Sequence, residues 1–429
     1  MRYVLTEVAE RAAKSSGFIK RRVKVTGSNF SQMLVLGWLS NPEATLEELC
    51  QSGVAVGLEI TPQGLDQRFT KEASDFMKLE LEAAVEQVIC SEPVAVQLLK
   101  RFNGVYVKDS STVTLPEKLA DVWVGCGNGQ GAGNAAVKLE TSLEMVSGEL
   151  DGPHLVDGRT NDRAAAQAHR PLPAGSLSLA DLGYWKVADM QTQAANEGYW
   201  LSRGHVSTAI FDEAGTQYTL VAFLSQQVTD VVDTPICLGV AERLSARLVA
   251  VRVPQEIAQQ RRRKLKKQAR DKGKTVSQAR LELADWTVFV TNVPGSLLSV
   301  EEVLVIARVR WQIELLFKLW KSHGQIDKSR SENPFRILTE LYAKLIGMII
   351  QHWIFLVSNW QFPDRSWVKA ARTVRQYAVC LLNAICDPTQ LDSILTTIAR
   401  CLSVGCRITK SAKEPRTFQL LLAVDETIS

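Results

Sequence analysis

The chain has 429 residues, of which 46% are hydrophobic and 22% charged, and a formal net charge of +4 at pH 7. These values are ordinary for a soluble globular protein of two or three domains, and so small a net charge does not by itself indicate a polyanionic partner. None of the eight cysteines forms a CxxC motif or has a histidine at zinc-site spacing, so we expect reduced thiols in the cytoplasm. The N-terminus has no apolar run, and we expect no signal peptide.

Residues 1–95 are predicted to be helical. Thr45 is expected to cap a helix, and Glu48 stands at the capping-box position three residues later. After a break that contains glycine, Pro62 opens a second helix, which we expect to run towards Phe76. Two short helices joined by such a break are typical of a helix-turn-helix, and any small α-hairpin has the same pattern.

Two aspartates are expected to end buried strands. Apolar residues alternate along segments 105–109 and 177–181, so Asp109 and Asp181 share a face with the apolar side chains before them. An aspartate in such a place is either the cap of the following turn or a functional carboxylate. The pattern also predicts strands at 137–146, 199–203 and 285–291, alternating strands up to about 252, a hairpin loop at 127–133, and helices at 164–170 and 187–197.

A run of basic residues precedes the strand at 285–291. Between Arg252 and Arg280 the sequence has eleven basic residues against two acidic ones, which concentrates positive potential far beyond the chain average. The run is either the solvated face of a helix or an arm that contacts phosphates. Its densest part contains Arg261, Arg262, Arg263 and Lys264.

Residues 306–321 are predicted to form one helix with an apolar side and a charged edge. At 100° per residue, Arg310, Glu314, Phe317 and Lys321 fall within one narrow stripe of this helix. Taken alone, the stripe indicates an i,i+4 ion-pair ladder worth a few tenths of a kcal/mol. The aspartates at 109 and 181 suggest a different use for its glutamate.

The tail from residue 337 onwards is predicted to be nearly all helix, broken at Pro363 and Pro388. Its uncharged stretch, 345–363, contains several polar residues, whereas a membrane span needs about 20 predominantly apolar ones. We therefore expect a buried core helix and no membrane partner.

Asp109, Asp181 and Glu314 together could hold two divalent metal ions. Such ions activate an attacking oxygen and stabilise the leaving oxygen in phosphodiester displacement, and carboxylate ligands favour Mg²⁺ or Mn²⁺ over zinc. Two strand-borne aspartates followed by a helix-borne glutamate fit a ribonuclease-H-like core. The basic, strand-containing block between Asp181 and Glu314 would then be an insertion.

These residues carry a resemblance to the bacterial insertion-sequence DDE transposases, in particular the cut-and-paste, hairpin-forming group. Arg310, Glu314 and Lys321 match that group's signature Tyr-(2)-Arg-(3)-Glu-(6)-Lys. The sequences Val-Lys-Asp-Ser-Ser-Thr around Asp109 and Leu-Ala-Asp-Leu-Gly-Tyr-Trp around Asp181 resemble the segments around the family's two aspartates. Residues 198–203 and 339–345 resemble its next strand and helix, and the resemblance spans about residues 30–360.

The resemblance implies that Asp109, Asp181 and Glu314 are catalytic and hold two divalent metal ions, Mg²⁺ or Mn²⁺. It departs from the signature at one place, because the position of the tyrosine is occupied by Ala307. In the family that tyrosine contacts DNA and is not a metal ligand. The departure therefore bears on the handling of strand ends more than on the metal chemistry.

The same resemblance implies DNA contacts. Arg310 and Lys321 would grip phosphates near the transposon tip. In the family a tryptophan of the inserted β-region stacks on a base flipped from the strand. Trp286 is the candidate, with core packing as the alternative reading, and Trp311 is a second candidate. The other expected DNA contacts are Lys318, Arg203, Arg261, Arg262, Arg263 and Lys264.

The sequence thus predicts an α+β or α/β protein with a ribonuclease-H-like catalytic core (96–205 and 300–335) and a β-rich basic insertion (206–299). A helical DNA-end-binding domain (1–95) and a C-terminal helical region (336–429) would flank it. We expect a transposase that binds double-stranded DNA at transposon ends and target as a homodimer, in the bacterial cytoplasm with the nucleoid. The alternatives are a DNA-binding repressor or architectural protein without cleavage, and another ribonuclease-H-like nuclease.

Overall fold

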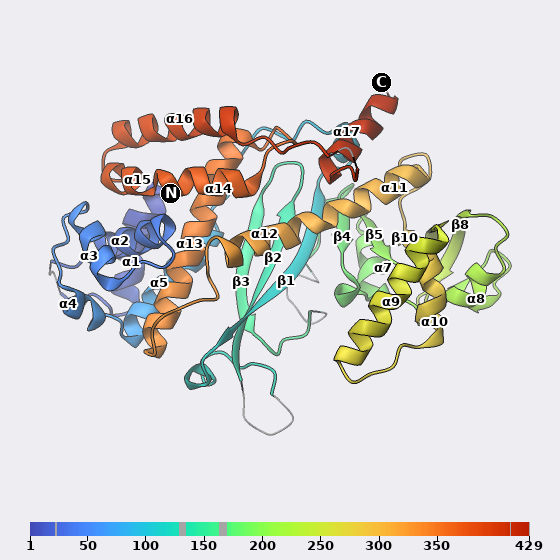
Figure 1. Ribbon diagram of the computed structural model, residues 1–429, viewed down its shortest axis with the longest axis horizontal. Coiled ribbons are helices and arrows are strands. Elements are labelled where there is room, and N and C mark those ends of the chain that lie inside the picture. The colour runs from blue at the N-terminus through green and yellow to red at the C-terminus, as the bar shows by residue number, and fades with distance from the viewer. Residues whose placement is uncertain (22–23, 128–133, 163–169, 412, 429) are drawn as a thin grey trace. The chain divides into compact units, whose positions relative to one another are not determined.

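The computed structural model describes residues 1–21, 24–127, 134–162, 170–411 and 413–428 (Figure 1). The chain divides into two compact units. Unit 1 comprises Met1–Ala95, Ser110–Thr160 and Ile313–Gln419, and unit 2 comprises Val96–Asp109, Asn161–Gln312 and Leu420–Ser429. The expected hairpin loop, apart from Gly127, and all of the expected helix at 164–170 except Arg170 lie outside the described residues.

Helices dominate the N-terminal part of unit 1. Thr45 caps α3 through a full capping box with Glu48, as the sequence predicted. The second predicted helix is wrong in its length: it ends at Asp66, because Thr70 caps a new helix by accepting a hydrogen bond from the backbone N–H of Ala73. The elements are η1 (Val4–Val8), α1 (Ala9–Ser15), α2 (Gly27–Ser40), α3 (Leu46–Val54), α4 (Pro62–Asp66) and α5 (Lys71–Val85).

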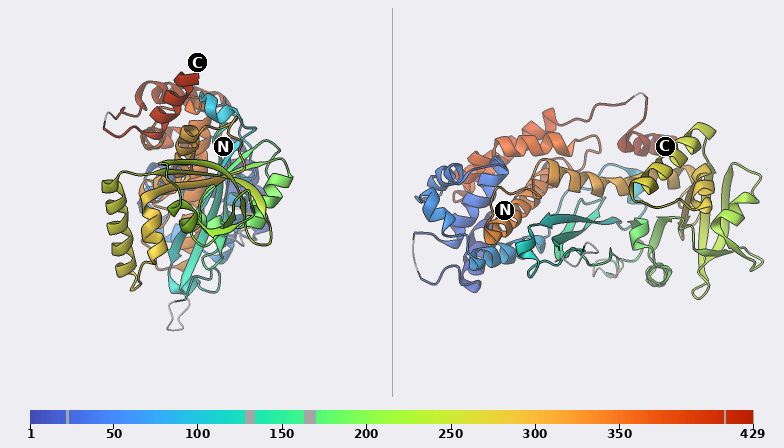
Figure 2. Two further views of the ribbon diagram at one scale, coloured as in Figure 1. Left: turned by 90° about the vertical axis from the view of Figure 1, so that its right-hand side faces the viewer. Right: turned by 60° about the horizontal axis from the view of Figure 1, so that its bottom comes forward.

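The long helix α13 (Pro334–Asn359) is the central element of unit 1. It packs against α2 and α5, and the views in Figures 1 and 2 both show it passing these N-terminal helices. By length and composition α13 could cross a membrane, yet 89% of its most apolar window is buried inside the protein. This burial agrees with the expected core helix. The other C-terminal helices are α14 (Trp367–Gln376), α15 (Ala378–Ala384), α16 (Pro388–Gly405) and α17 (Thr417–Ile428).

A ten-stranded mixed sheet has the strand order β3-β2-β1-β4-β5-β10-β9-β8-β6-β7. β4 is parallel to both β1 and β5, whereas β2 and β3 form an antiparallel pair. The order 3-2-1-4-5 with this mixture of directions is the ribonuclease-H-like arrangement, and the mixed α/β fold class is confirmed. The strands are β1 (Val105–Leu115), β2 (Ala135–Glu144), β3 (Leu150–Asp157), β4 (Leu177–Ala180), β5 (Tyr199–Arg203), β6 (Ala209–Phe211), β7 (Gln217–Thr219), β8 (Val231–Leu238), β9 (Leu244–Arg252) and β10 (Trp286–Thr291).

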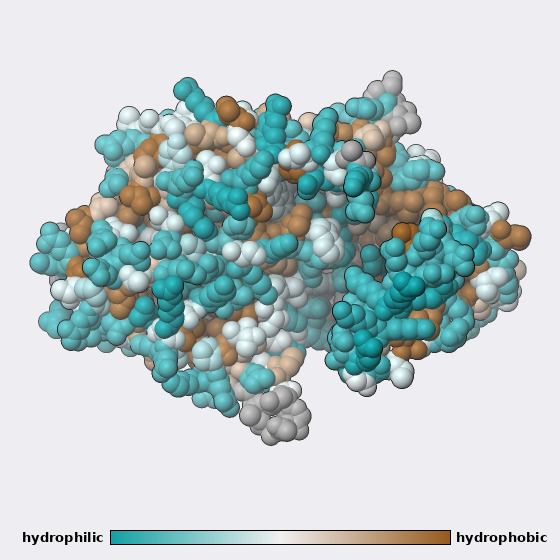
Figure 3. Space-filling view, in the orientation of Figure 1, coloured by the Kyte–Doolittle hydropathy of each residue, from teal (hydrophilic) through white to brown (hydrophobic). Residues whose placement is uncertain are grey.

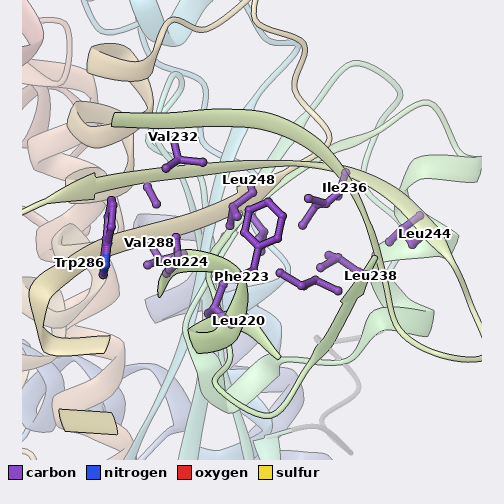
Figure 4. Close-up of a cluster of buried hydrophobic side chains, with 14 of the residues drawn as sticks. Leu220, Phe223, Leu224, Val232, Ile236, Leu238, Leu244, Leu248, Trp286 and Val288 are labelled. Carbon is purple, nitrogen blue, oxygen red and sulfur yellow. The ribbon is translucent and has the colours of Figure 1, made fainter. Parts of the chain in front are cut away.

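The last five strands of this order belong to the segment between the second aspartate and the glutamate-bearing helix. β10 pairs antiparallel with both β5 and β9, so the inserted strands continue the sheet. Their inward side chains form an apolar core with α8 (Figure 4), including Phe223, Leu248, Trp286 and Val288. In chain order, the other helical elements between residues 96 and 322 are α6 (Gln97–Lys100), η2 (Glu117–Leu119), η5 (Leu182–Tyr184), α7 (Val187–Ala195), α8 (Leu220–Ser225), α9 (Gln255–Asp271), α10 (Gln278–Glu282), η6 (Leu283–Asp285), α11 (Val300–Ile306), η7 (Ala307–Arg310) and α12 (Trp311–Ser322).

Candidate active site

Asp109 and Asp181 are placed by two neighbouring parallel strands, β1 and β4. In the register of β1 and β4, Lys108 is opposite Ala180. Asp109 is the next residue of β1, and Asp181 directly follows the last residue of β4. β4 ends at Ala180, one residue before Asp181, and Asp181 directly precedes the 3₁₀ turn η5. Since the two strands run in the same direction, the backbone brings both carboxylates to the same level of the sheet.

The prediction that Asp109 ends its strand is wrong. β1 continues for six more residues to Leu115. The segment that follows Asp109 contains Thr112, Val113 and Thr114, whose β-branched side chains favour an extended strand over the turn suggested by the two serines before them. Asp109 is therefore held within a long strand, where backbone pairing restricts it more than a turn would.

A pocket of about 200 Å³ opens beside Asp181 and is lined by residues of β4, β5 and α7. Lys108 and Lys186 contribute cationic groups to its lining. Two further lining groups, the indole N–H of Trp200 and the amide nitrogen of Gln193, are buried without a hydrogen-bond partner among the described residues. Lys186 is paired with Asp189 at 3.2 Å, so it is the two unpartnered donors, on Trp200 and Gln193, that favour a ligand with hydrogen-bond acceptors.

The sequence analysis did not single out Lys108, Lys186, Gln193 or Trp200. Lys108 and Trp200 lie on strands whose positions were predicted correctly, on the face opposite the apolar alternation. Their only sequence signal was this alternation, which also describes ordinary half-buried strands. The pocket depends on the pairing of β4 with β5 and on the position of α7, neither of which a local pattern specifies.

Glu314 lies in the first turn of α12, on a half-buried position. The prediction of one continuous helix over 306–321 is wrong, because α11 ends at Ile306 and the 3₁₀ turn η7 separates it from α12. Arg310 is the last residue of that turn, so it does not share a regular helical stripe with Glu314. Neither proline nor glycine marks the break, and the 3.6-residue periodicity could not reveal it.

Lys321 is attached to the strand that carries Asp109. Its Nζ donates a hydrogen bond of 2.8 Å to the backbone carbonyl of Thr112, three residues after the aspartate. Thr112, Glu314 and Lys321 all belong to unit 1. The bond holds α12 against the second half of β1. Lys321 therefore has a structural contact that the sequence did not predict.

The three predicted carboxylates are distributed between the units: Asp109 and Asp181 belong to unit 2, and Glu314 belongs to unit 1. Within the described part of the chain, no group of three or more His, Cys, Asp or Glu side chains forms a ready metal site. What the structure supplies is a pair of aspartates in adjacent register, whose oxygen donors are of the kind that Mg²⁺ and Mn²⁺ prefer.

The two candidate tryptophans differ sharply in exposure. Trp286 is 7% exposed, packs in the core of unit 2, and lies under the guanidinium of Arg252 at 4.4 Å from the ring centroid. Trp311, by contrast, is 54% exposed on the first turn of α12, and Lys318 is exposed two turns further along the same helix. Of these two tryptophans, Trp311 is the one whose ring is exposed to solvent.

The four basic residues singled out on α9 divide into two kinds. Arg261 donates hydrogen bonds of 3.0 Å to the carbonyl of Trp286 and to Thr287 Oγ1, and Arg262 bonds to the carbonyl of Leu281 and to Asp285. Arg263 and Lys264 are exposed. Burial lowers the pKa of Arg261, and the positive charge of Arg203 at the end of β5 lowers it further.

Residues 100–350, more than half of the chain, match the family described as the transposase DDE domain. The chain belongs to the DDE transposase family. It is 26% identical to the transposase for insertion sequence element IS231F of Bacillus thuringiensis subsp. israelensis, over 99% of this chain and 94% of that relative. It is 23% identical to the transposase for insertion sequence element IS1151 of Clostridium perfringens, over 81% of this chain and 78% of that relative.

This transposase also aligns with a solved structure, the piggyBac transposase synaptic complex with hairpin DNA. The TM-score is 0.42 at 10% sequence identity, and the alignment covers 95% of this chain and 84% of that chain. The predictions of a bacterial insertion-sequence DDE transposase and of an enzyme are confirmed by the family match and the named relatives. Members of the family generally use divalent metal ions, and DNA is their partner.

Proposed function

We propose that this transposase binds the terminal inverted repeats of a mobile element, cleaves DNA at its ends and joins the freed ends to target DNA. The observation that carries the proposal is the adjacent register of Asp109 and Asp181 on parallel strands of a ribonuclease-H-like sheet. Glu314, at its matching place in the family signature, would complete the set. A bound pair of Mg²⁺ or Mn²⁺ ions would supply charge stabilisation for in-line displacement at phosphorus.

The side chains around this set have separate roles in the proposal. Asp109, Asp181 and Glu314 provide the carboxylate oxygens that hold the metal ions. Arg310 and Lys321 contact phosphates at the transposon end, and Lys321 exchanges its bond with the carbonyl of Thr112 for one with the DNA. Charge-assisted contacts of this kind fix the position of the strand without reading its sequence.

Cleavage would proceed through a hairpin, in which the freed 3′-OH attacks the opposite strand and a base leaves the stack. Of the two candidate tryptophans, the exposed Trp311 is ready to stack on such a base, whereas Trp286 would first have to leave its core position under Arg252. The helices of residues 1–95 would recognise the inverted repeats. Two copies of the chain, one for each end, would assemble on DNA, in the bacterial cytoplasm with the nucleoid.

The proposal is tested with purified full-length protein, Mg²⁺, and a plasmid that carries the element with its flanking ends. We expect nicked and linear products from the wild type, and a loss of at least about 100-fold in cleavage rate for Glu314→Gln with DNA binding retained. Glu332→Gln, which removes an exposed carboxylate without an assigned role, is the matched control. The catalytic proposal would be overturned if the wild type bound DNA without cleaving it, or if Glu314→Gln cleaved DNA as fast as the wild type. The first result would favour a DNA-binding protein without cleavage.

A further inference from the structure

The parallel strands β1 and β4 are joined just before they begin, by contacts that the carboxylate chemistry does not use. Side chains make the surface of α9 strongly hydrophilic (Figure 3), whereas backbone groups form most of these contacts. The backbone N–H of Asn103 donates a 3.0 Å hydrogen bond to the carbonyl of Gly175, and its side-chain amide donates one of 2.8 Å to the carbonyl of Ala174. We call these two hydrogen bonds the Asn103–Gly175 junction. The N–H of Leu177 then donates to the carbonyl of Gly104 at 2.8 Å, where the pairing of the two strands starts.

The junction has the same register as the two aspartates. Asn103 precedes Asp109 by six residues, and Gly175 precedes Asp181 by six residues. The four residue pairs of β1 and β4 between them follow in continuous register. A slip of one residue would move one aspartate by about 3.3 Å along its strand and turn it to the other face of the sheet. The register set at the junction is therefore the one that brings the two carboxylates level.

Gly175 has a backbone conformation and a close neighbour that both favour glycine. Its φ is +74°, in the left-handed region, and a Cβ atom on it would lie 2.6 Å from Nδ2 of Asn103. The Asn103 side chain is exposed, so alanine at position 175 would displace its amide from the carbonyl of Ala174. The N–H of Gly175 also donates to the carbonyl of Glu197 at 2.8 Å, just before β5. The glycine thus connects the starts of all three parallel strands.

We propose that Asn103 and Gly175 are positioning residues, whose junction fixes the register of β1 against β4 and so presents Asp109 and Asp181 as a pair to a divalent metal ion. The inference rests on the proposed function, because it assumes that these two aspartates hold the metal. β4 has only four residues, so few ladder hydrogen bonds specify its register, and contacts at its start have a large share in doing so.

The test uses the full-length protein and gives each variant a matched control. Asn103→Ala removes the side-chain bond of the junction. Asn292→Ala removes two side-chain bonds that join the end of β10 to the start of β5, strands that carry neither aspartate. Gly175→Ala is matched by Gly215→Ala, because Gly215 has a φ of +81° and no described atom within 4 Å of an added Cβ.

Mn²⁺ binding is measured without DNA, from the rise of the urea unfolding midpoint with Mn²⁺ concentration, since an ion that binds the folded protein stabilises it according to its Kd. Asp109→Asn/Asp181→Asn is the blank. We expect Asn103→Ala to weaken Mn²⁺ binding about 3–10-fold, as the loss of one hydrogen bond would, and Gly175→Ala to weaken it at least as much. Asn103→Ala/Gly175→Ala should bind no more weakly than Gly175→Ala alone, because both changes act on one contact. Asn292→Ala and Gly215→Ala should keep the wild-type Mn²⁺ affinity, even where they unfold at lower urea.

Wild-type Mn²⁺ affinity in both Asn103→Ala and Gly175→Ala would overturn the inference. An equal loss of affinity in Asn292→Ala would also overturn it, because the effect would then follow general stability. So would a wild-type protein that Mn²⁺ stabilises no more than the blank, since the junction would then present no ready pair.

The failure of this inference is distinguishable from failure of the proposed function. Cleavage of the element plasmid by the wild type is assayed separately, at saturating Mn²⁺. If the wild type binds Mn²⁺ above the blank and does not cleave DNA, the catalytic proposal fails, and the comparison of Mn²⁺ affinities still decides the role of the junction.

Discussion

The backbone pairing of β1 with β4 sets the relative position of Asp109 and Asp181. Because β1 and β4 are parallel and Lys108 is opposite Ala180, the backbone pairing makes neighbours of two aspartates that are far apart in the sequence. The alternation of apolar residues predicted both strands, and the family signature singled out the aspartates. Neither could show that β1 extends past Asp109, since serines next to an aspartate are also typical of turns.

Ala307 is the residue at which the chain departs from the family signature. It is half-buried at the start of η7, three residues before Arg310. We expect Ala307→Tyr to tighten binding to the element end about 3–10-fold, because an aromatic ring and a hydroxyl would be added where the signature places a DNA contact. The variant should lose less than about 1 kcal/mol of stability, from the lower helix propensity of tyrosine.

The measurement is a binding titration with the element-end duplex, with Ala307→Leu as the control for added bulk without an aromatic ring or hydroxyl. An equal gain in the leucine variant would assign the effect to bulk alone. No gain in the tyrosine variant would mean that this chain handles its DNA ends without a contact at position 307.

At the scale of elements, sequence patterns predicted the positions of many helices and strands correctly. They were less successful for the residues at which these elements end. The strand 199–203 and the capping box of Thr45 and Glu48 appear where they were predicted, because both depend on local chemistry. The breaks at residues 67–70 and 307–310 were missed. The second has no helix breaker, so the change from α-helical to 3₁₀ turn depends on tertiary context that a periodic pattern does not contain.

The basic run gives the clearest case of residues that look alike in sequence and differ in structure. Arg261→Gln should lower the free energy of unfolding by about 1–3 kcal/mol, since it removes hydrogen bonds of a charged group to the Trp286 carbonyl and to Thr287. Lys264→Gln, three residues later and exposed, should change it by no more than about 0.5 kcal/mol. Urea unfolding of both variants tests the difference, and equal destabilisation would contradict the anchoring role of Arg261.

At the scale of the whole molecule, the order of the sheet could not be predicted from the sequence. β10 pairs with β5 across more than eighty residues of chain, and this pairing makes the insertion a continuation of the catalytic sheet. Local periodicity identifies a strand and says nothing about its neighbours. The predicted boundary of the insertion at residue 206 stays a prediction, and the apolar core that β8, β9 and β10 share with α8 also includes Trp200 of β5.

Two buried ionisable groups of unit 1 give global stability a defined pH dependence. Burial raises the pKa of Glu80 to about 8, and its Oε1 accepts a 2.5 Å hydrogen bond from Ser31. Burial lowers the pKa of His352 to about 4, although its contact with the carbonyl of Gly148 acts in the opposite direction. The stability contributed by His352 is complete above its unfolded pKa of about 6.5 and is lost as the pH falls through 4.

The contribution of Glu80 to stability has the opposite pH dependence. Its folded pKa lies above the unfolded value, so its contribution is complete below about pH 4.5 and is lost as the pH rises through 8. Between pH 6.5 and 8, where the opposing slope from His352 fades as its unfolded-state imidazole loses its proton, we expect Glu80 to reduce the free energy of unfolding by about 1.4 kcal/mol per pH unit at most. Glu80→Gln, which can still accept the bond from Ser31, should remove this slope and become more stable relative to the wild type as the pH rises. Urea unfolding at pH 6.5, 7.25 and 8 measures the effect, with the exposed-residue variant Glu82→Gln as control, and parallel curves for wild type and Glu80→Gln would show that Glu80 does not retain its proton in the folded protein.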